Sequence, residues 1–247
     1  MRNVFKRLQE MIHARKKFIV GIIAPSKFEK SPIWISSNPS PFTNPTRLSA
    51  EIFRKFKHFG TDKSSNHSYH FPYSFVLGKM RTSSTMLEIG IGSTKSNIPF
   101  NMSWKENYKP GSSLFAWRDL GFFSKIVGAD IDPVQFEFGE NLECLYVDQT
   151  SRKSLLKLAK QLHEKGLTPL DLIVDDGIHQ VEYNLLSFET LSGTLGAQGL
   201  YVIEDLKQVD LWPVITRLRE LGFLNWHLWI NPSEGENCSM IIIEMKK

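Results

Sequence analysis

The sequence predicts a doubly wound α/β fold, in which a mainly parallel sheet carries helices on both faces. Two observations support this class. From residue 85 onward, short apolar runs alternate with longer segments of helical periodicity. The run at residues 170–175 also has a continuous apolar core, which is typical of a parallel strand buried on both faces.

The expected elements follow one another from residue 49 to the end of the chain. The last two strands are joined by the turn-rich residues 231–235, and we expect them to form an antiparallel hairpin. The predicted helices are 49–59, one beginning near residue 111, 151–164, 181–195 and 212–221. The predicted strands are 86–91, 125–130, 144–147, 170–175, 200–203, 226–230 and 239–244.

Composition indicates an ordinary globular protein. A chain of 247 residues that is 41% hydrophobic and 23% charged can bury one α/β core and an appendage. Cys144 and Cys238 lack the paired spacing of a disulfide framework or a zinc site, so we expect buried, reduced thiols. The apolar run at 18–24 is too short to span a bilayer and lacks a convincing cleavage site. We therefore expect a cytoplasmic protein without a transmembrane segment.

Positive charge is concentrated at the start of the chain. Residues 1–60 contain 12 Lys and Arg against 3 Asp and Glu, whereas the rest contains 18 against 23. We divide the chain into a basic extension, residues 1–57, and an α/β domain, residues 58–247. The extension is expected to hold an amphipathic helix at 1–17 and a Pro/Ser-rich arm at 25–48. It lacks the aromatic–basic interleaving of nucleic-acid modules, so we expect no nucleic-acid partner and a solvated or homo-oligomeric role.

A glycine loop and a pair of acids follow the first two strands of the α/β domain. Gly90 and Gly92 remove Cβ atoms where the backbone has to approach a ligand closely. Asp130 and Asp132 close the second strand, where a carboxylate can accept hydrogen bonds from both ribose hydroxyls. In an open parallel sheet, ligands bind beyond these carboxyl ends. The pattern favours a nucleotide-type cofactor over a structural turn.

The type of cofactor is indicated by the length of the segment after the loop. A pyrophosphate needs a compact Gly-x-Gly-x-x-Gly turn that runs directly into a helix. Here 18 residues, 93–110, separate Gly92 from Gly111, which argues against NAD and FAD. Asp148 and Gln149 close the third strand, where they can reach an adenine edge. These features favour an adenosine-bearing methyl donor.

Acidic residues close the fourth and fifth strands. The fourth ends in Asp175 and Asp176, with His179 after them, and the fifth ends in Glu204 and Asp205. Two carboxylates ~4 Å apart repel by roughly 4 kcal/mol at an effective dielectric near 20, so a cation is expected between them. Mg2+ is the natural candidate; the alternative is that Asp176 caps the helix after the fourth strand and Glu204 pairs with Lys207. His179 is placed to act as a general base.

With these residues in hand, the chain resembles a known family of class I S-adenosylmethionine-dependent methyltransferases. The family is that of the metal-dependent sugar O-methyltransferases of macrolide biosynthesis, of the demethylmacrocin O-methyltransferase type. The resemblance runs from about residue 58 to residue 206. The matching stretches are 59–63, 69–70, 87–92, 111–114, 126–132, 148–149, 175–179 and 201–206.

The resemblance implies a seven-stranded Rossmann-like sheet with an antiparallel last strand and a bound S-adenosylmethionine. It implies Mg2+, or Mn2+, on Asp176, Glu204 and Asp205. It further implies catalytic roles for His179, as the base, and for Asp176. The expected methyl acceptor is a hydroxyl of a sugar or of a glycosylated small molecule. The residues assigned to the cofactor are Glu88, Gly90, Gly92, Ser113, Asp130, Asp132, Asp148, Gln149 and Asp175.

Two other classes of function stay open at this point. The first is a metal-independent methyltransferase of small molecules, in which the acids are structural and His179 works alone. The second is a non-catalytic protein that binds S-adenosylmethionine. Fold and cofactor site can be shared by enzymes with different acceptors, so the residues alone leave the acceptor unnamed.

Overall fold

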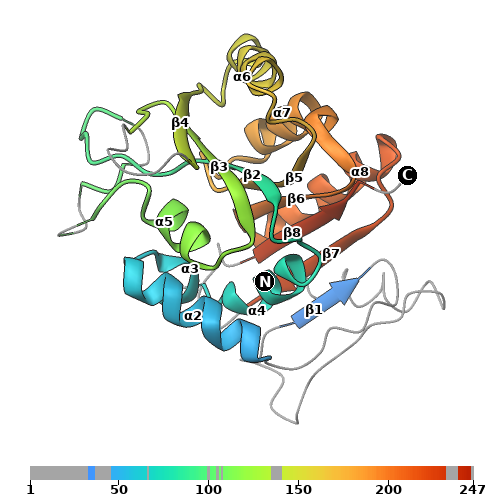
Figure 1. Cartoon of the computed structure of the whole chain (residues 1–247). Coiled ribbons are helices and arrows are strands. Elements are labelled where there is room, and N and C mark those ends of the chain that lie inside the picture. Colours follow the sequence, from blue (N-terminus) through green and yellow to red (C-terminus); the bar gives the residue numbers. More distant parts are fainter. Residues whose placement is uncertain are drawn as a thin grey trace.

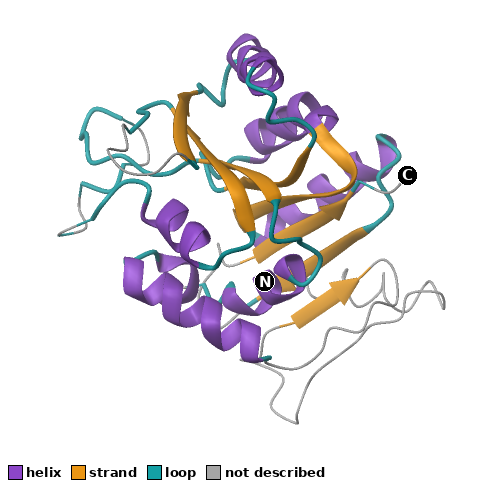
Figure 2. Ribbon diagram, in the orientation of Figure 1, coloured by secondary structure: helices purple, strands orange, loops and turns teal. Residues whose placement is uncertain are grey.

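The chain folds into one mixed sheet with helices against both of its faces (Figure 1). The structure, a computed structural model, describes residues 33–36, 46–65, 67–98, 101–103, 106, 108–134, 141–231 and 239–245. Helices and strands alternate from residue 84 onward, as the predicted α/β class requires (Figure 2). The predicted helix at residues 1–17 lies outside the described residues, as does Cys238, whereas Cys144 is a half-buried free thiol.

Seven of the eight strands are the predicted ones, and the parallel strands lie together in the sheet. The strand order is β1-β7-β8-β6-β5-β2-β3-β4. Strands β2 to β6 pair in parallel, whereas β7 and β8 form the predicted antiparallel hairpin. The antiparallel last strand is therefore confirmed. The bounds are β1 (Ile33–Ser36), β2 (Ser84–Ile89), β3 (Phe123–Asp130), β4 (Leu142–Tyr146), β5 (Leu170–Asp175), β6 (Leu195–Leu206), β7 (Trp226–Ile230) and β8 (Ser239–Glu244).

The eighth strand, β1, comes from the segment that was expected to be an irregular arm. It pairs antiparallel with β7, with Ile33 opposite Ile230. The run Ile-Trp-Ile-Ser between Pro32 and Pro39 is rich in residues that favour strands. An edge position tolerates neighbouring prolines, because proline is confined there by its missing donor. The expectation of irregular structure is therefore wrong for these four residues.

The helices form two layers, one on each side of the sheet (Figure 1). One layer packs its apolar side chains into the core with Leu87 and Ile173, and the other packs with Met86 and Leu172. Successive residues of a strand point to opposite faces, so each buried strand supplies both cores. The first layer is α6 (Arg152–Glu164), α7 (Val181–Leu191) and α8 (Leu211–Glu220); the second is α2 (Arg47–Phe59), α4 (His70–Leu77) and α5 (Ser112–Asp119).

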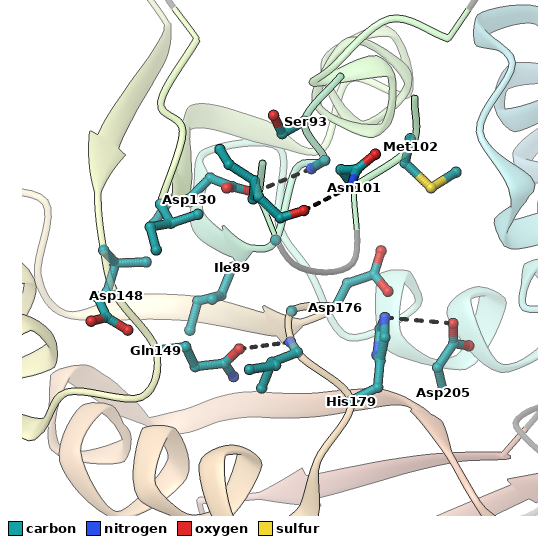
Figure 3. A pocket seen from close by; sticks show the side chains of 18 of the residues that line it. Ile89, Ser93, Asn101, Met102, Asp130, Asp148, Gln149, Asp176, His179 and Asp205 are labelled. Atoms are coloured by element: carbon teal, nitrogen blue, oxygen red, sulfur yellow. Dashed lines mark hydrogen bonds and ion pairs between the residues drawn. The ribbon is translucent and has the colours of Figure 1, made fainter. Parts of the chain in front are cut away.

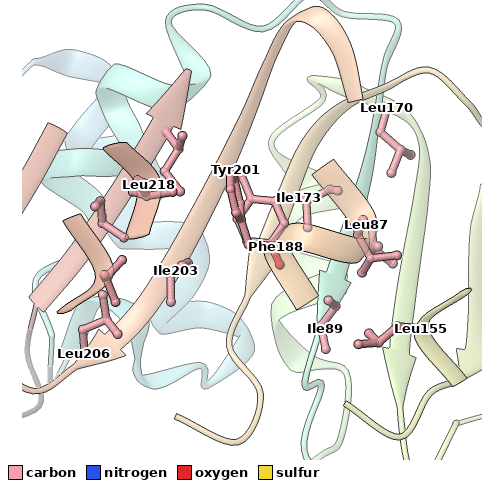
Figure 4. Packing of buried hydrophobic residues seen from close by; sticks show 14 of the residues in the cluster. Leu87, Ile89, Leu155, Leu170, Ile173, Phe188, Tyr201, Ile203, Leu206 and Leu218 are labelled. Carbon is pink, nitrogen blue, oxygen red and sulfur yellow. The ribbon is translucent and has the colours of Figure 1, made fainter. Parts of the chain in front are cut away.

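Aromatic side chains help to fix the first layer on the sheet. Phe188 of α7 meets Tyr201 of β6 edge to face, with 5.1 Å between ring centroids (Figure 4). Edge-to-face pairs contribute about 0.5–1.5 kcal/mol beyond the area that they bury. The middle of β6 is therefore fixed by its packing against α7, while the residues near its end lie at the candidate site.

Helix α2 belongs to the α/β domain. Thr46 and Ser49 form a reciprocal capping box at its start, and the helix ends at Gly60, where φ is +76°. Ile52 and Phe56 are fully buried. The predicted boundary between residues 57 and 58 falls inside this helix, so we propose that the domain begins near Thr46.

The order of strands reverses between β2 and β5. From β2 the chain builds outward through β3 to β4, and it then returns to place β5 and β6 on the other side. Ligands bind at such a switch point, beyond the carboxyl ends of the strands. No helix in the described part of the chain is long and apolar enough to cross a membrane.

Candidate active site

A cavity of about 540 Å³ opens at the switch point (Figure 3). The ends of β2, β3 and β4 line one part of it, and the residues after β5 and Asp205 near the end of β6 line the other. Its volume lies in the range typical of small-molecule sites. Among the lining residues are Gly90, Gly92, Asp130, Asp148, Gln149, Asp176, His179 and Asp205, all of which were predicted.

The glycine loop after β2 has a tight geometry. Gly90 and Gly92 have φ values of +81° and +79°. A Cβ on Gly90 would stand 2.1 Å from the carbonyl oxygen of Asp176, and a Cβ on Gly92 would stand 2.2 Å from the Tyr108 hydroxyl. The loop is therefore wedged between the segment after β5 and the side chain of Tyr108, and only glycine fits both positions.

Asp130 holds this loop in place from the end of β3. Its Oδ2 accepts hydrogen bonds from the backbone N–H groups of Ile91, at 2.9 Å, and Gly92, at 3.2 Å. Burial raises the pKa of the Asp130 carboxyl, although these N–H donors oppose the shift. Asp130 borders the cavity as well, so one carboxylate both organises the loop and faces the ligand space.

Gln149 connects the ends of β4 and β5. Its Nε2 donates to Oδ1 of Asp175 at 2.7 Å, and its Oε1 accepts from the backbone N–H of Ile178 at 2.9 Å (Figure 3). Asp148 lies beside it on the cavity wall, where its Oδ1 accepts from the backbone N–H and the hydroxyl of Thr150. Both predicted residues therefore line the cavity, and Gln149 also fixes the segment that carries His179.

Four residues that were assigned to the cofactor do not line the cavity: Glu88, Ser113, Asp132 and Asp175. Glu88 and Asp175 are completely buried, because strand alternation turns them into the two cores. The Asp132 carboxylate is taken up by the Ser93 hydroxyl, at 2.7 Å, and by the Lys95 ammonium, at 2.5 Å. These residues lie behind those that line the cavity. We therefore assign them a supporting role and not a direct contact with the cofactor.

The second part of the cavity gathers two carboxylates and an imidazole. One ligand atom from each of Asp176, His179 and Asp205 lies within 4.8 Å of the other two. Figure 3 shows the three side chains together, with Ser93 and Asn101 on the far side of the pocket. His179 Nε2 lies 4.0 Å from Oδ2 of Asp205. This group could hold a divalent cation.

Backbone strain is concentrated around this group. Three described residues other than glycine have positive φ: Ser68 at +53°, His179 at +53° and Asp205 at +54°. Such conformations cost of order 1 kcal/mol or more and persist where the surroundings fix them. His179 and Asp205 themselves line the cavity. Their strained backbone costs stability and fixes the directions of these two side chains.

Glu204 occupies a different place from the one predicted. Its carboxylate is buried behind the cavity, where Oε2 accepts from the Lys63 ammonium at 2.6 Å and Oε1 accepts from the Tyr73 hydroxyl. Burial raises the pKa of Glu204 well above its usual range, and Lys63 opposes that shift. His179 stands in the three-residue group instead, and Glu204 supports the group from behind.

Lys63, from the short helix α3 (Asp62–Ser65), is the cation that the acidic cluster was expected to need. It is only 1% exposed, and its Nζ lies 2.6 Å from Asp176, 2.6 Å from Glu204 and 3.2 Å from Glu88. Burial by itself lowers the pKa of this lysine, but the three carboxylates raise it well above its usual value. The ammonium is therefore charged inside the protein.

Sequence reasoning missed Lys63 as a site residue, although the stretch Gly60-Thr61-Asp62-Lys63 stood out. The available signal was strand alternation: residues 86 and 88, 172 and 174, and 200 and 202 face the same layer. Glu88 belongs to the first of these rows, and Glu204 continues the last. Two buried acids on one face call for a basic residue from the helices above them. Further lining residues are Asp62, Ser93, Ile98, Asn101, Met102 and Tyr108.

The chain is similar in sequence and in structure to known proteins. No family model matches the chain. The chain is 29% identical over 155 residues, 62% of its length, to the 8-demethyl-8-α-L-rhamnosyl tetracenomycin-C 2'-O-methyltransferase of Streptomyces olivaceus. It is 31% identical over 128 residues, 52% of its length, to the demethylmacrocin O-methyltransferase of Streptomyces fradiae. Its homologues are sugar O-methyltransferases.

The solved structures that resemble this chain include a methyltransferase. MycE methyltransferase from the mycinamycin biosynthetic pathway, in complex with Mg, SAH and mycinamycin VI, matches with a TM-score of 0.53 and 25% identity, over 66% of this chain and 39% of that one. A second crystal of MycE with Mg and SAH matches 82% of this chain with a TM-score of 0.60 and 21% identity. The methyltransferase fold predicted from the sequence is confirmed.

The matched region is a limited part of these O-methyltransferases. It spans 37% of the length of the tetracenomycin enzyme and 28% of the demethylmacrocin enzyme. The shared part in this chain therefore corresponds to about a third of each relative.

Proposed function

We propose that this chain is an S-adenosylmethionine-dependent O-methyltransferase that methylates a hydroxyl of a sugar or a glycosylated small molecule. One observation carries the proposal. One cavity has a tight glycine loop backed by Asp130 at one part and Asp176, His179 and Asp205 at the other. The first part suits a nucleoside, and the second suits a hydroxyl that has to lose its proton.

The residues present fit the cofactor. Gly90 and Gly92 leave no room for a Cβ, and the cavity volume is sufficient for a ligand of this size. Asp130 borders the cavity with a carboxylate that could accept from the ribose hydroxyls, and Asp148 and Gln149 follow β4, where we expect the adenine edge. Tyr108 and Met102 from the 93–110 segment also line the cavity.

The residues present also fit a divalent cation. Asp176 and Asp205 offer carboxylate oxygens, which are the ligands that Mg2+ and Mn2+ prefer. When bound there, the cation supplies Lewis acidity, which lowers the pKa of a coordinated hydroxyl. Glu204 was predicted as a third ligand, and its hydrogen bonds to Lys63 and Tyr73 give it the role of supporting the cluster.

His179 is the proposed base. Its Nε2 lies 4.0 Å from Oδ2 of Asp205, one of the two carboxylates that would hold the cation. In the proposed step, the acceptor oxygen forms a bond to the methyl carbon, the carbon–sulfur bond breaks and S-adenosylhomocysteine leaves. The hydroxyl proton goes to His179. General base catalysis of this kind is worth typically 10²–10⁴-fold in rate, and alignment of oxygen, carbon and sulfur supplies the rest.

His179 has a second candidate role, because its nitrogen lies in the group that could hold the cation. Magnesium favours oxygen ligands, whereas imidazole suits softer metals, so a magnesium enzyme leaves His179 free as the base. The substitution His179→Ala separates the two roles. As a base its loss slows turnover with Mn2+ affinity nearly intact, whereas as a ligand its loss weakens both.

Methyl transfer assays test the proposal. The protein is incubated with S-adenosylmethionine and a panel of glycosylated small molecules, nucleotide sugars and simple phenols, and products are read by mass spectrometry. We expect methylated glycosides, loss of turnover in EDTA and recovery with Mg2+ or Mn2+. Full turnover by a metal-free preparation would support the metal-independent alternative, and binding of the cofactor without turnover of any acceptor would support the non-catalytic one.

A pair of variants locates the activity in the cavity. Asp176→Asn should abolish most turnover while S-adenosylhomocysteine still binds, because the cofactor contacts come from the other strands. Asp171→Asn is the matched control on the same strand, since Asp171 accepts from the backbone N–H of Thr85 at 2.8 Å, at the opposite end of β5. Equal losses in the two variants would argue against the assigned site.

Association of copies through residues 1–57 and a cytoplasmic location stay predictions.

A further inference from the structure

Lys63 is the residue whose place the reaction does not explain. It comes from the four-residue helix α3, and its ammonium reaches the ends of three strands at once. Glu88 closes β2, Asp176 follows β5 and Glu204 lies near the end of β6. A lysine is almost never fully buried unless it is paired, and this one is paired with three acids.

The sequence pattern creates the need for this lysine. Alternation along the strands turns Glu88 and Glu204 to the same face, so both carboxylates enter the core that contains Trp117 and Tyr73. Trp117 donates from Nε1 to Glu88 at 2.9 Å. These neutral donors satisfy hydrogen bonds but carry no charge. The Lys63 ammonium supplies the positive charge that these buried carboxylates otherwise lack.

The lysine also shares a ligand with the candidate metal group. Asp176 directs Oδ2 to Lys63 at 2.6 Å, and the same carboxylate lines the cavity with Asp205. A cation held by Asp176 and Asp205 would therefore lie close to a fixed positive charge. The two positive charges repel each other, so the lysine weakens the affinity of the group for a divalent ion.

We propose that Lys63 is a positioning residue, a built-in cation that withdraws Glu88 and Glu204 from metal binding and limits the acidic cluster to one weakly held divalent ion. This rests on the proposed metal-assisted function. Weak binding suits a site in which an acceptor hydroxyl must enter and leave beside the metal. In the absence of the lysine, four acids would stand together with no internal cation: Glu88, Asp176, Glu204 and Asp205.

A purely structural lysine would behave in the opposite way. If Lys63 only stabilised the fold, its removal would loosen Asp176 and weaken metal binding. If it acts as the internal cation, its removal frees acidic ligands and removes a repulsion, so metal binding becomes tighter. The sign of the change in metal affinity therefore separates the two roles, independently of turnover.

The test counts bound Mn2+ by electron paramagnetic resonance of the free ion, on the full chain without cofactor. We expect one weakly bound Mn2+ in the wild type and, in Lys63→Met, binding at least tenfold tighter or a second bound ion. Lys79→Met is the matched control, because Lys79 pairs with Glu244 at 2.5 Å on the β8 strand and is not among the cavity residues. It should bind Mn2+ as the wild type does.

A second pair of variants keeps the test decisive if Lys63→Met does not fold, which circular dichroism would reveal. Glu204→Gln is compared with the double variant Lys63→Met, Glu204→Gln, in which one buried acid fewer is left uncompensated. The double variant should bind Mn2+ at least tenfold more tightly than Glu204→Gln. Unchanged or weaker binding on removal of the lysine overturns the inference. Absence of Mn2+ binding in every variant, wild type included, overturns the metal site itself.

Discussion

The hydroxyl of Tyr69 donates a 2.6 Å hydrogen bond to Oδ1 of Asp205, and the backbone N–H of Asp205 donates back to the same hydroxyl at 3.2 Å. Asp205 has a φ of +54°, which a residue with a side chain adopts only when its surroundings fix it. His67 Nδ1 lies 3.6 Å from the same carboxylate oxygen. The segment before α4 therefore sets the direction of a predicted metal ligand.

Tyr69→Phe should loosen that ligand without unfolding the protein. Loss of the two hydrogen bonds lets the Asp205 carboxylate turn, so we expect Mn2+ affinity and turnover to fall about tenfold, which corresponds to roughly 1.4 kcal/mol. Calorimetric Mn2+ titration measures it. Tyr201→Phe is the control, since Tyr201 is another buried tyrosine within 3.4 Å of an acid, Asp175, which does not line the cavity. Equal losses in both variants would contradict the assigned role.

Gly90→Ala should remove cofactor binding. The new Cβ would meet the backbone of Asp176 at 2.1 Å, and backbone cannot move aside as a flexible side chain can. Gly166→Ala measures the cost of positive φ alone, because φ is +68° there and nothing lies within 4 Å. We expect about 1 kcal/mol of destabilisation for Gly166→Ala. For Gly90→Ala we expect clearly more, with no measurable S-adenosylhomocysteine affinity. Denaturant unfolding and calorimetry give both numbers.

Stability should fall on mild acidification because of His70. Its ring is buried between Phe53 and Phe71, and burial lowers its pKa from 6.5 to about 4. The unfolded chain therefore takes up a proton first, and stability that is present above pH 6.5 is lost as pH falls toward 4. Allowing for solvent screening, we expect a loss of about 2 kcal/mol over this range.

The substitution His70→Leu checks this origin of the acid sensitivity. Leucine keeps an apolar side chain in the same space and cannot be protonated. The free energy of unfolding of the variant should fall less than that of the wild type between pH 6.5 and 4, as measured by urea denaturation. Parallel curves for the two proteins would show that the sensitivity arises elsewhere.

The start of the folded domain can be measured by truncation. A chain beginning at Thr46 keeps the capping box and the whole of α2, and we expect it to fold and bind S-adenosylhomocysteine. A chain beginning at Arg54 loses Ile52, which is fully buried. Deletion of one such side chain costs about 2–5 kcal/mol, so this chain should be markedly less stable. Equal stability would mean that α2 is dispensable and that the boundary lies later.

Much of the fold was predictable because it depends on local patterns. The bounds of β5, β7 and β8 agree with the sequence prediction to the residue, since apolar runs and turn residues define them. The end of α7 was missed: the helix stops at Leu191 and a turn of 3-10 helix, Ser192–Thr194, leads into β6. Of the residues that the prediction assigned to the helix beyond Leu191, three form this turn and Leu195 begins β6.

The site was predicted in part, for a different reason. Glycines and acids at strand ends can be located from the sequence, and Gly90, Asp130 and Asp176 do line the cavity. Whether a carboxylate faces the ligand or the core depends on strand alternation and on what packs above it. From the sequence we therefore assigned Glu204 to the metal. Its partner in the structure, Lys63, lies 141 residues away in sequence and was not predicted.

The central claim, that this cavity binds the methyl donor, is tested most directly by calorimetric titration with S-adenosylhomocysteine. The account predicts one binding site per chain, and at least tenfold weaker binding in Asp130→Ala, which loses the carboxylate that holds the backbone N–H groups of Ile91 and Gly92. Binding of NAD with no binding of S-adenosylhomocysteine would contradict it.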